Sequence, residues 1–330
     1  MSSDLRTSLP VIACVAGASI ALATAFSSCA DPNFALRSIV RTPRILAIVG
    51  EPPEINPGQL TTLHAITGGA SDGATFRWFV CARAEASATF TAQSTFGVTA
   101  DDEGCFGDAA VQLGPSFDGP NYIFTVPGNL FDNIAALRAI YGQGISLASL
   151  QQIVNIAGIP VTIAVEMHDG NAPPVRAIKR IIVSGRAVTN HNPPAPSFRF
   201  GVRADGGMGG VHVSAVDTDP ELCASDTRAA LMVRPGQVVQ IAPDTNSADW
   251  LETYTTLDSS GGIQTTTEVA YYSFFSTDGT WDDDRTRIPI QNTIWHAPMR
   301  PGTTTMWIIV RDGRGGTSGC RFNVNVGTTM

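Results

Sequence analysis

Three acidic clusters hold the residue types whose spacing comes closest to a metal site. They occupy residues 101–103, 217–221 and 282–284. Ca²⁺ takes about six to eight oxygen ligands, and Asp217, Asp219 and Glu221 alternate along one short segment, so they are the best candidates for a calcium site. None of the clusters has the Asp-x-Asp-x-Asp-Gly pattern of a calcium loop. We expect solvated turns, with weak calcium binding at 217–221 as the alternative and no other cofactor.

Catalytic motifs are absent from the sequence. The five histidines form no His-Glu-x-x-His pattern, and the chain has neither a Gly-x-Ser-x-Gly elbow nor a Walker loop. A glycosidase-like carboxylate pair could arise from Glu252, Glu268 and the 282–284 cluster only if the fold brings them together. We therefore expect no catalytic residue and no enzyme, and keep an envelope hydrolase as a third hypothesis.

A dense aromatic segment is a candidate binding surface. It reads Tyr271-Tyr272-Ser273-Phe274-Phe275, with Trp281 close behind. Successive side chains of a strand point to opposite faces, so Tyr271, Tyr272 and Trp281 could form an exposed platform for a glycan or a protein. The favoured alternative is a central strand that is buried on both faces.

Six cysteines divide by position. Cys14 lies in an apolar N-terminal run, Cys29 follows that run, and four remain for the body of the protein: Cys81, Cys105, Cys223 and Cys320. Three pairings are possible, and the domain boundary given below favours Cys81–Cys105 and Cys223–Cys320. A zinc site is the alternative, but no Cys-x-x-Cys pair or Cys/His cluster has metal spacing.

The N-terminus has the pattern of an export signal. Residues 8–28 carry no charge and 9–26 are apolar and rich in alanine, which predicts a signal peptide at 1–28. Phe26-Ser27-Ser28-Cys29 is similar to a lipobox, so we expect lipidation of Cys29 and attachment to a membrane. Cleavage after Ala25 or Ala30, giving a secreted protein, and an uncleaved anchor are the alternatives.

Length and charge limit the remaining possibilities. The 330 residues correspond to about two domains, and only 15% are charged. The net charge is −8, and Lys179 is the only lysine. Because the chain has no basic block, we expect no nucleic-acid partner.

Strand patterns organise the first half. After a tether at 29–43, apolar residues repeat at nearly every second position in 44–49, 59–66 and 76–81, and 161–167 and 177–183 form a hairpin around Asp169-Gly170. These strands predict a β-sandwich domain at 44–186, with Trp78 in its core. Residues 129–157 instead repeat at helical spacing, which predicts a helix-turn-helix insertion. The insertion either covers a sheet edge or forms a groove for a ligand, and edge cover is favoured.

A linker at 187–197, rich in Pro and Asn, separates this half from a second sandwich at 198–327. The second half repeats the turn motifs of the first. Pro235-Gly236-Gln237 corresponds to Pro57-Gly58-Gln59, and Asp312-Gly313 corresponds to Asp169-Gly170. Pro-Gly before an alternating strand and Asp-Gly in a hairpin are typical sandwich turns. We infer two diverged copies of one module, in a fold that is mainly β.

Residues 307–316, Trp-Ile-Ile-Val-Arg-Asp-Gly-Arg-Gly-Gly, together with Trp78 and the Pro-Gly-Gln strand starts, resemble PKD-type and other immunoglobulin-like domains of bacterial surfaces. Cys29, Asp31-Pro32, and the segments 41–47, 51–54 and 179–184 resemble uncharacterised lipoproteins of myxobacteria. The resemblance implies two immunoglobulin-like β-sandwiches in the cell envelope and implies no activity.

Together these patterns predict a non-catalytic, extracytoplasmic, lipid-anchored module at the outer membrane, the cell surface or in the periplasm. We expect it to bind or support proteins of the envelope or of an extracellular assembly. A glycan-binding adhesin that uses the aromatic segment is the alternative function, and simple secretion is the alternative location.

Overall fold

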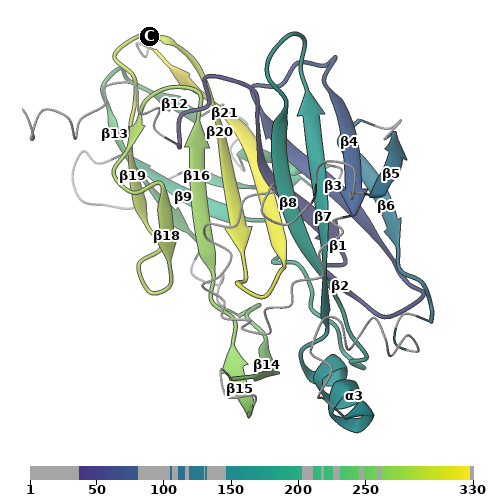
Figure 1. The fold of residues 1–330 in the computed structure, drawn as a ribbon. Helices are drawn as coiled ribbons and strands as arrows, with labels where there is room; N and C mark the ends of the chain where they lie inside the picture. The colour runs from purple at the N-terminus through teal and green to yellow at the C-terminus, as the bar shows by residue number, and fades with distance from the viewer. Residues whose placement is uncertain are drawn as a thin grey trace, which may run out of the picture. The chain divides into compact units, whose positions relative to one another are not determined.

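The computed structural model describes residues 37–80, 105, 111–115, 119–129, 131, 146–202, 211–216, 219–225, 231–244, 249–258 and 262–327. Ser38–Met330 form one compact unit that is almost entirely β-structure (Figure 1). The expected signal peptide, Cys29 and most of the expected tether lie outside the described residues. Among the described residues, no helix is both long and apolar enough to cross a membrane.

The first half is a sandwich of two sheets. One sheet has the order β1-β3-β6 and the other β2-β8-β7-β4-β5. The strands are β1 (Arg44–Glu51), β2 (Glu54–Ile55), β3 (Leu60–Gly68), β4 (Thr75–Val80), β5 (Val111–Pro115), β6 (Asn121–Thr125), β7 (Ile159–His168) and β8 (Val175–Val183). Alternate residues of both sheets meet between them, and Leu63, Trp78 and Ile163 are fully buried there. The predicted core position of Trp78 is confirmed.

The second half is also a two-layered sandwich. One layer has the order β17-β19-β13-β9-β10, the other β11-β21-β20-β16-β18, and β12 pairs with β21. The strands are β9 (Ser197–Val202), β10 (Val211–Val216), β11 (Asp219–Ser225), β12 (Leu231–Val233), β13 (Val238–Pro243), β16 (Tyr271–Ser276), β17 (Thr280–Trp281), β18 (Arg285–Arg287), β19 (Thr293–His296), β20 (Gly302–Arg311) and β21 (Thr317–Val326). Hydrogen bonding between β10 and β11 joins the layers, and a separate hairpin contains β14 (Thr253–Leu257) and β15 (Ile263–Thr267).

The two halves share one strand order. In the first half β2, β8, β7 and β4 are neighbours, and in the second β12, β21, β20 and β16 are neighbours in the same sequence. The short strands β2 and β12 both pair in parallel with the last strand of their half. The facing sheets correspond likewise, since β3 lies between β1 and β6 as β13 lies between β9 and β19. This correspondence supports the inferred duplication and makes both halves immunoglobulin-like sandwiches.

The Pro-Gly turns match in detail. Gly58 and Gly236 both have positive φ, at 83° and 70°, a backbone region that favours glycine. The glutamine that follows each glycine accepts a hydrogen bond from a backbone N–H three residues earlier, Gln59 Oε1 from Asn56 and Gln237 Oε1 from Arg234. The repeated Pro-Gly-Gln therefore encodes one turn geometry twice.

Helix α3 (Leu147–Ile156) confirms the second helix of the predicted insertion. The Ser146 hydroxyl caps its start by accepting from the Ser149 N–H over 3.1 Å. Gly158, which follows the helix, has φ 75°, and a Cβ there would lie 2.4 Å from Ile182 Cγ2. Residues 132–145, which include most of the first predicted helix, lie outside the described residues. That helix therefore stays a prediction.

Candidate functional site

An apolar contact joins the two halves. Residues of β20 alternate, so that Met306, Ile308 and Val310 enter the second core while Trp307 and Ile309 point out of it. The outward pair is nonetheless buried, because it packs against the first half. Together with Trp307 and Ile309, four residues of the first half form one apolar cluster: Val40, Leu46, Ala47 and Ile66. The outer face of the second sandwich is thus covered by β1 and β3 of the first.

Gly319 on β21 permits this close packing. A Cβ at this position would lie 2.7 Å from Ile309 Cδ1 and 2.8 Å from Ile66 Cδ1. Real Cβ atoms do not approach side chains so closely, so a larger residue would force the ends of these two isoleucine side chains to move.

The segment before β1 also pairs with the second half. The Val40 N–H donates to the Ser276 carbonyl over 2.8 Å, and the Ser276 N–H donates to the Ser38 carbonyl over 2.9 Å. Ile39 consequently forms a parallel bridge with the end of β16. The chain therefore contacts the second sandwich before it enters the first.

A buried polar cluster lies beside the apolar contact. We call it the polar clamp, and it contains Glu54, Arg186, Asn190, Asp312 and Arg314. The Glu54 carboxylate, 1% exposed, accepts from Arg314 Nη2 at 2.8 Å, from Arg186 Nη1 at 3.1 and 3.2 Å, and from the Asn190 N–H at 3.0 Å. First half, linker and second half thus converge on one carboxylate.

Asp312 shapes the loop that presents Arg314. Its Oδ1 accepts from the N–H groups of Arg314, Gly315 and Gly316 at 2.7–2.9 Å. Its Oδ2 accepts from Asn190 Nδ2 at 3.0 Å. A Cβ on Gly316 would lie 2.1 Å from Asp312 Oδ2, so only glycine fits. The Asp-Gly-x-Gly-Gly pattern is therefore a scaffold for one arginine.

Arg314 also binds the base of the β14–β15 hairpin. Its Nη1 lies 3.1 Å from Glu252 Oε2 and 3.6 Å from Glu268 Oε1, and its guanidinium stacks 4.5 Å above the Tyr254 ring centre. The fold brings together Glu252 and Glu268, the two glutamates considered above for a glycosidase-like carboxylate pair. The Glu252 N–H donates to Glu268 Oε2 at 2.9 Å. Glu268 is buried, and both carboxylates lie against the Arg314 guanidinium, so they form a structural ion cluster with this arginine.

Two buried groups of this region have shifted pKa values. Burial raises the pKa of Glu268 to about 7, and the charges of Asp312 and Glu252 add to the shift. Burial lowers the pKa of Lys179, the only lysine, to about 8. Its Nζ donates to the Gly315 carbonyl and to Thr317 Oγ1. Strand β8 of the first half therefore also binds the loop that follows Asp312.

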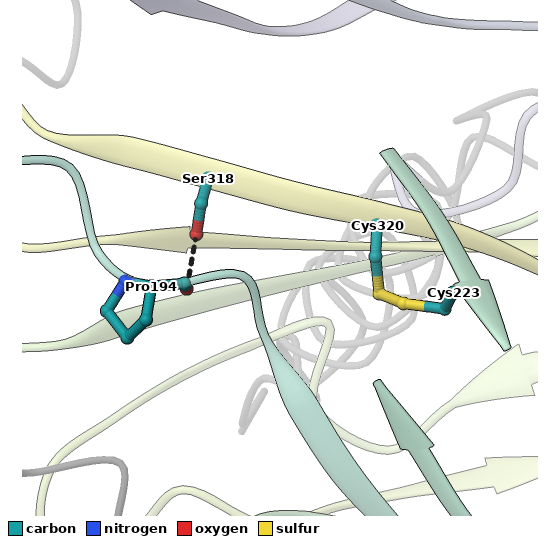
Figure 2. The surroundings of a disulfide bond; sticks show 4 residues. All are labelled: Pro194, Cys223, Ser318 and Cys320. Carbon is teal, nitrogen blue, oxygen red and sulfur yellow. Dashed lines mark hydrogen bonds between the residues drawn. A yellow bond between two sulfur atoms is a disulfide. The ribbon is translucent and has the colours of Figure 1, made fainter. Parts of the chain in front are cut away.

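The disulfide Cys223–Cys320 is present, as predicted, and links β11 to β21 across 97 residues (Figure 2). Nearby, Ser318 Oγ donates to the Pro194 carbonyl at 3.1 Å, which ties the linker to β21. Cys105 is buried and disulfide-bonded. Cys81 lies outside the described residues, so Cys81–Cys105 stays a prediction.

The structure describes two of the three calcium candidates. Asp217 lies outside the described residues, whereas Asp219 and Glu221 lie on β11. The Glu221 carboxylate contacts His64 Nε2 of β3, which is another contact between the halves. Within the described part of the chain, no group of three or more His, Cys, Asp or Glu could hold a metal ion.

The structure corrects the hypothesis of an exposed aromatic platform at Tyr272. This side chain is 2% exposed, because β16 lies between β18 and β20 and its even-numbered residues face the second core. Trp281 is half-buried, and its ring centre lies 5.3 Å from that of Phe274. Its Nε1–H donates to Ser276 Oγ. Tyr271 is also half-buried. The favoured alternative, a central strand, agrees with these positions.

Comparisons with known proteins do not carry the assignment of the fold. No protein-family model matches the sequence. No curated protein matches it either. The D00-D0 domain of intimin aligns with a TM-score of 0.20 and 10% identity, over 87% of this chain and 99% of that one. The SGBP-B protein of the Bacteroides ovatus mixed-linkage glucan utilization locus, solved with a heptasaccharide, gives 0.22 and 10%, over 86% and 47%. The fold assignment rests on the strand order above.

Sequence patterns missed the polar clamp. Glu54 was visible only as part of a Glu-Pro-Pro-Glu turn, Arg186 only as the last residue of the predicted first domain, and Asn190 only as a residue of the predicted linker. A buried ion cluster carries no periodic signal, because its members come from segments far apart in the chain. The one available signal was Arg314 within the glycine-rich loop.

Proposed function

We propose that the protein is an exported, non-catalytic support and interaction module, in which two sandwiches act as one rigid body tethered to a membrane through Cys29. The observation that carries the proposal is the contact between the halves, which consists of the apolar cluster around Trp307 and Ile309 and the polar clamp. We call this contact the joint. Linked domains move relative to each other unless their interface is extensive and apolar. Here Trp307 and Ile309 pack into the first half, and Arg314 reaches Glu54 beside them.

The polar clamp supports a defined orientation more than it supports stability. Ion pairs in the protein interior lose hydration, so their net contribution to stability is small, but they require one geometry. Glu54 meets donors from three segments, and each donor has a fixed direction. A hinge motion between the halves would leave these charges buried and unpaired. The clamp therefore suits a protein that holds a binding surface at a fixed distance from its tether.

Export is supported by the disulfide and by the N-terminal sequence. Disulfides persist in oxidising compartments, and Cys223–Cys320 is well inside the fold, since Cys320 is 1% exposed. Lipidation of Cys29 would place the rigid unit at a membrane surface through a short tether. The absence of a catalytic motif in the sequence agrees with a support or binding role.

Fractionation of producing cells tests the proposal. The wild-type protein should sediment with membranes, and its N-terminal peptide should carry the mass of a lipid on Cys29. The Cys29→Ser variant should be released into the soluble exported fraction while it keeps the Cys223–Cys320 disulfide. A soluble wild-type protein, or one that keeps residues 1–28, would contradict the tether.

A further inference from the structure

Three arginines lie beside the joint, on the outer face of the second sandwich. Strands β18, β16 and β20 are neighbours in one sheet, and the outward residues of β20 are Trp307, Ile309 and Arg311. The first half covers Trp307 and Ile309. On β18, Arg285 and Arg287 are exposed on either side of a buried threonine, so they point to the same outer face as Arg311. The part of this face next to the joint is therefore basic.

The strand register places these arginines around two hydroxyl groups of β16. Tyr271 lies directly opposite Arg287 of β18 on one side and Arg311 of β20 on the other. Ser273, the next outward residue of β16, lies opposite Arg285. Directly opposed residues have Cβ atoms about 5 Å apart, so the three guanidinium groups surround the surface of these two residues. We call the five residues the arginine patch.

Arg311 binds only neutral partners among the residues that the structure describes. Its Nη1 donates to Ser273 Oγ at 3.1 Å, and its Nη2 donates to the Leu46 carbonyl of β1 at 3.3 Å. Burial, together with the positive charge of Arg285, lowers the pKa of Arg311 to about 10. Charged groups that lose hydration are normally paired with an opposite charge. An anion bound beside Arg311 would supply that charge.

The acidic run that precedes β18 does not neutralise the patch. Asp282 pairs with His296 of the other layer at 2.8 Å. Within the described ranges, neither Arg287 nor Arg311 forms an ion pair with a carboxylate. By contrast, both arginines of the polar clamp bind Glu54. The patch therefore differs from the clamp in having cations that the chain itself does not compensate.

We propose that the arginine patch binds the phosphate group of a small molecule. A phosphate monoester carries a charge of about −1.5 to −2 at pH 7 and has three strong acceptor oxygens. It can therefore accept hydrogen bonds from several guanidinium groups at once, and the planar fork of arginine suits phosphate well. A carboxylate has a single charge and would compensate fewer of the cations. The Tyr271 and Ser273 hydroxyl groups add neutral donors at the same place.

Charge favours a small ligand over an anionic membrane. Exposed charges are screened beyond about 8 Å at physiological salt, so a small ion at the patch responds mainly to the three arginines. A lipid surface would also meet the acidic remainder of the chain, whose net charge is −8. The patch does not depend on attachment through Cys29, so this inference goes beyond the proposed support role and is independent of the tether.

Calorimetric titration of the compact unit Ser38–Met330 with inorganic phosphate tests the proposal. The wild type should bind phosphate saturably, and Arg287→Gln should weaken binding about tenfold, as expected for the loss of one charge-assisted hydrogen bond. Arg287 is exposed, so this variant should keep the wild-type urea midpoint. Arg321→Gln is the control, because it removes the same charge from an exposed position on β21 and should bind like the wild type. No saturable binding by the wild type, or equal weakening by both variants, would overturn the proposal.

Two further arms identify the ligand class. Acetate at the same concentration and ionic strength should not displace phosphate, and equal displacement would overturn the assignment to phosphate. Vesicles of phosphatidylcholine and phosphatidylglycerol should not sediment with Ser38–Met330. Sedimentation that Arg287→Gln abolishes would overturn the small ligand in favour of a lipid headgroup. Because this fragment lacks Cys29, failure of either arm leaves the proposed tether intact.

Discussion

Arg314 Nη2 donates to Glu54 Oε2 over 2.8 Å, and both side chains are buried between the two sandwiches. Arg314 lies in the loop after β20, held by Asp312, whereas Glu54 lies in β2 of the other half. This pair therefore exists only when the halves have one relative position.

Loss of the arginine should be costly. Arg314→Ala leaves Glu54 and Glu268 with less compensation in the interior, and we expect a loss of about 3–5 kcal/mol in the free energy of unfolding, measured by urea titration. Arg300→Ala is the control, because Arg300 pairs with Asp278 but is 85% exposed, and it should change stability by less than about 1 kcal/mol. Similar effects of the two variants would argue against a structural clamp.

Gly319 tests the apolar part of the joint. Gly319→Ala places a Cβ against Ile309 and Ile66 and should cost about 1–3 kcal/mol by the same titration. A second change, Ile66→Val, removes one of the clashing methyl groups and should restore part of the loss. Gly201→Ala is the control, since a Cβ there meets nothing within 4 Å. A neutral Gly319→Ala would show that the contact is looser than described.

The pKa of Glu268 predicts a pH dependence. The folded-state pKa is raised to about 7, so the folded protein binds more protons than the unfolded chain between about pH 4.5 and 7. Stability from this group is therefore present below pH 4.5 and is lost as the pH rises through 7. Arg314 faces this carboxyl group, as do Glu252, Asp312 and Tyr254.

Glu268→Gln isolates that titration. The variant keeps an acceptor for the Glu252 N–H but cannot ionise, so its stability relative to wild type should increase from about pH 4.5 to about pH 7 and then level off. Unfolding titrations at several pH values measure the difference. A difference that is constant with pH would contradict the raised pKa.

The disulfide should stabilise the second sandwich strongly. Cys223–Cys320 closes a loop of 97 residues, and removing such a bond costs about 2–5 kcal/mol. The variant Cys223→Ser/Cys320→Ser should have a correspondingly lower urea midpoint. Peptide mapping without reduction should recover a 223–320 link from the wild type, and a 105–320 link would refute this pairing.

The sequence predicted the elements that have a local signal. Strand alternation located β3 and β7, the Pro-Gly-Gln motifs located two matching turns, and Trp78 identified the first core. The joint was not predictable in this way. The uninterrupted apolar run 306–310 in β20 indicates burial on both faces, but it does not show that the first half covers Trp307 and Ile309. Whether Tyr272 is exposed also depended on its neighbours β18 and β20, which a single strand pattern does not reveal.

Calorimetric unfolding of Ser38–Met330 tests the central claim most directly, namely that the two sandwiches form one cooperative unit. Coupling through Trp307, Ile309 and Arg314 predicts a single transition whose calorimetric and van't Hoff enthalpies agree. Two separate transitions in the wild type, one for residues 44–186 and one for 198–327, would contradict it.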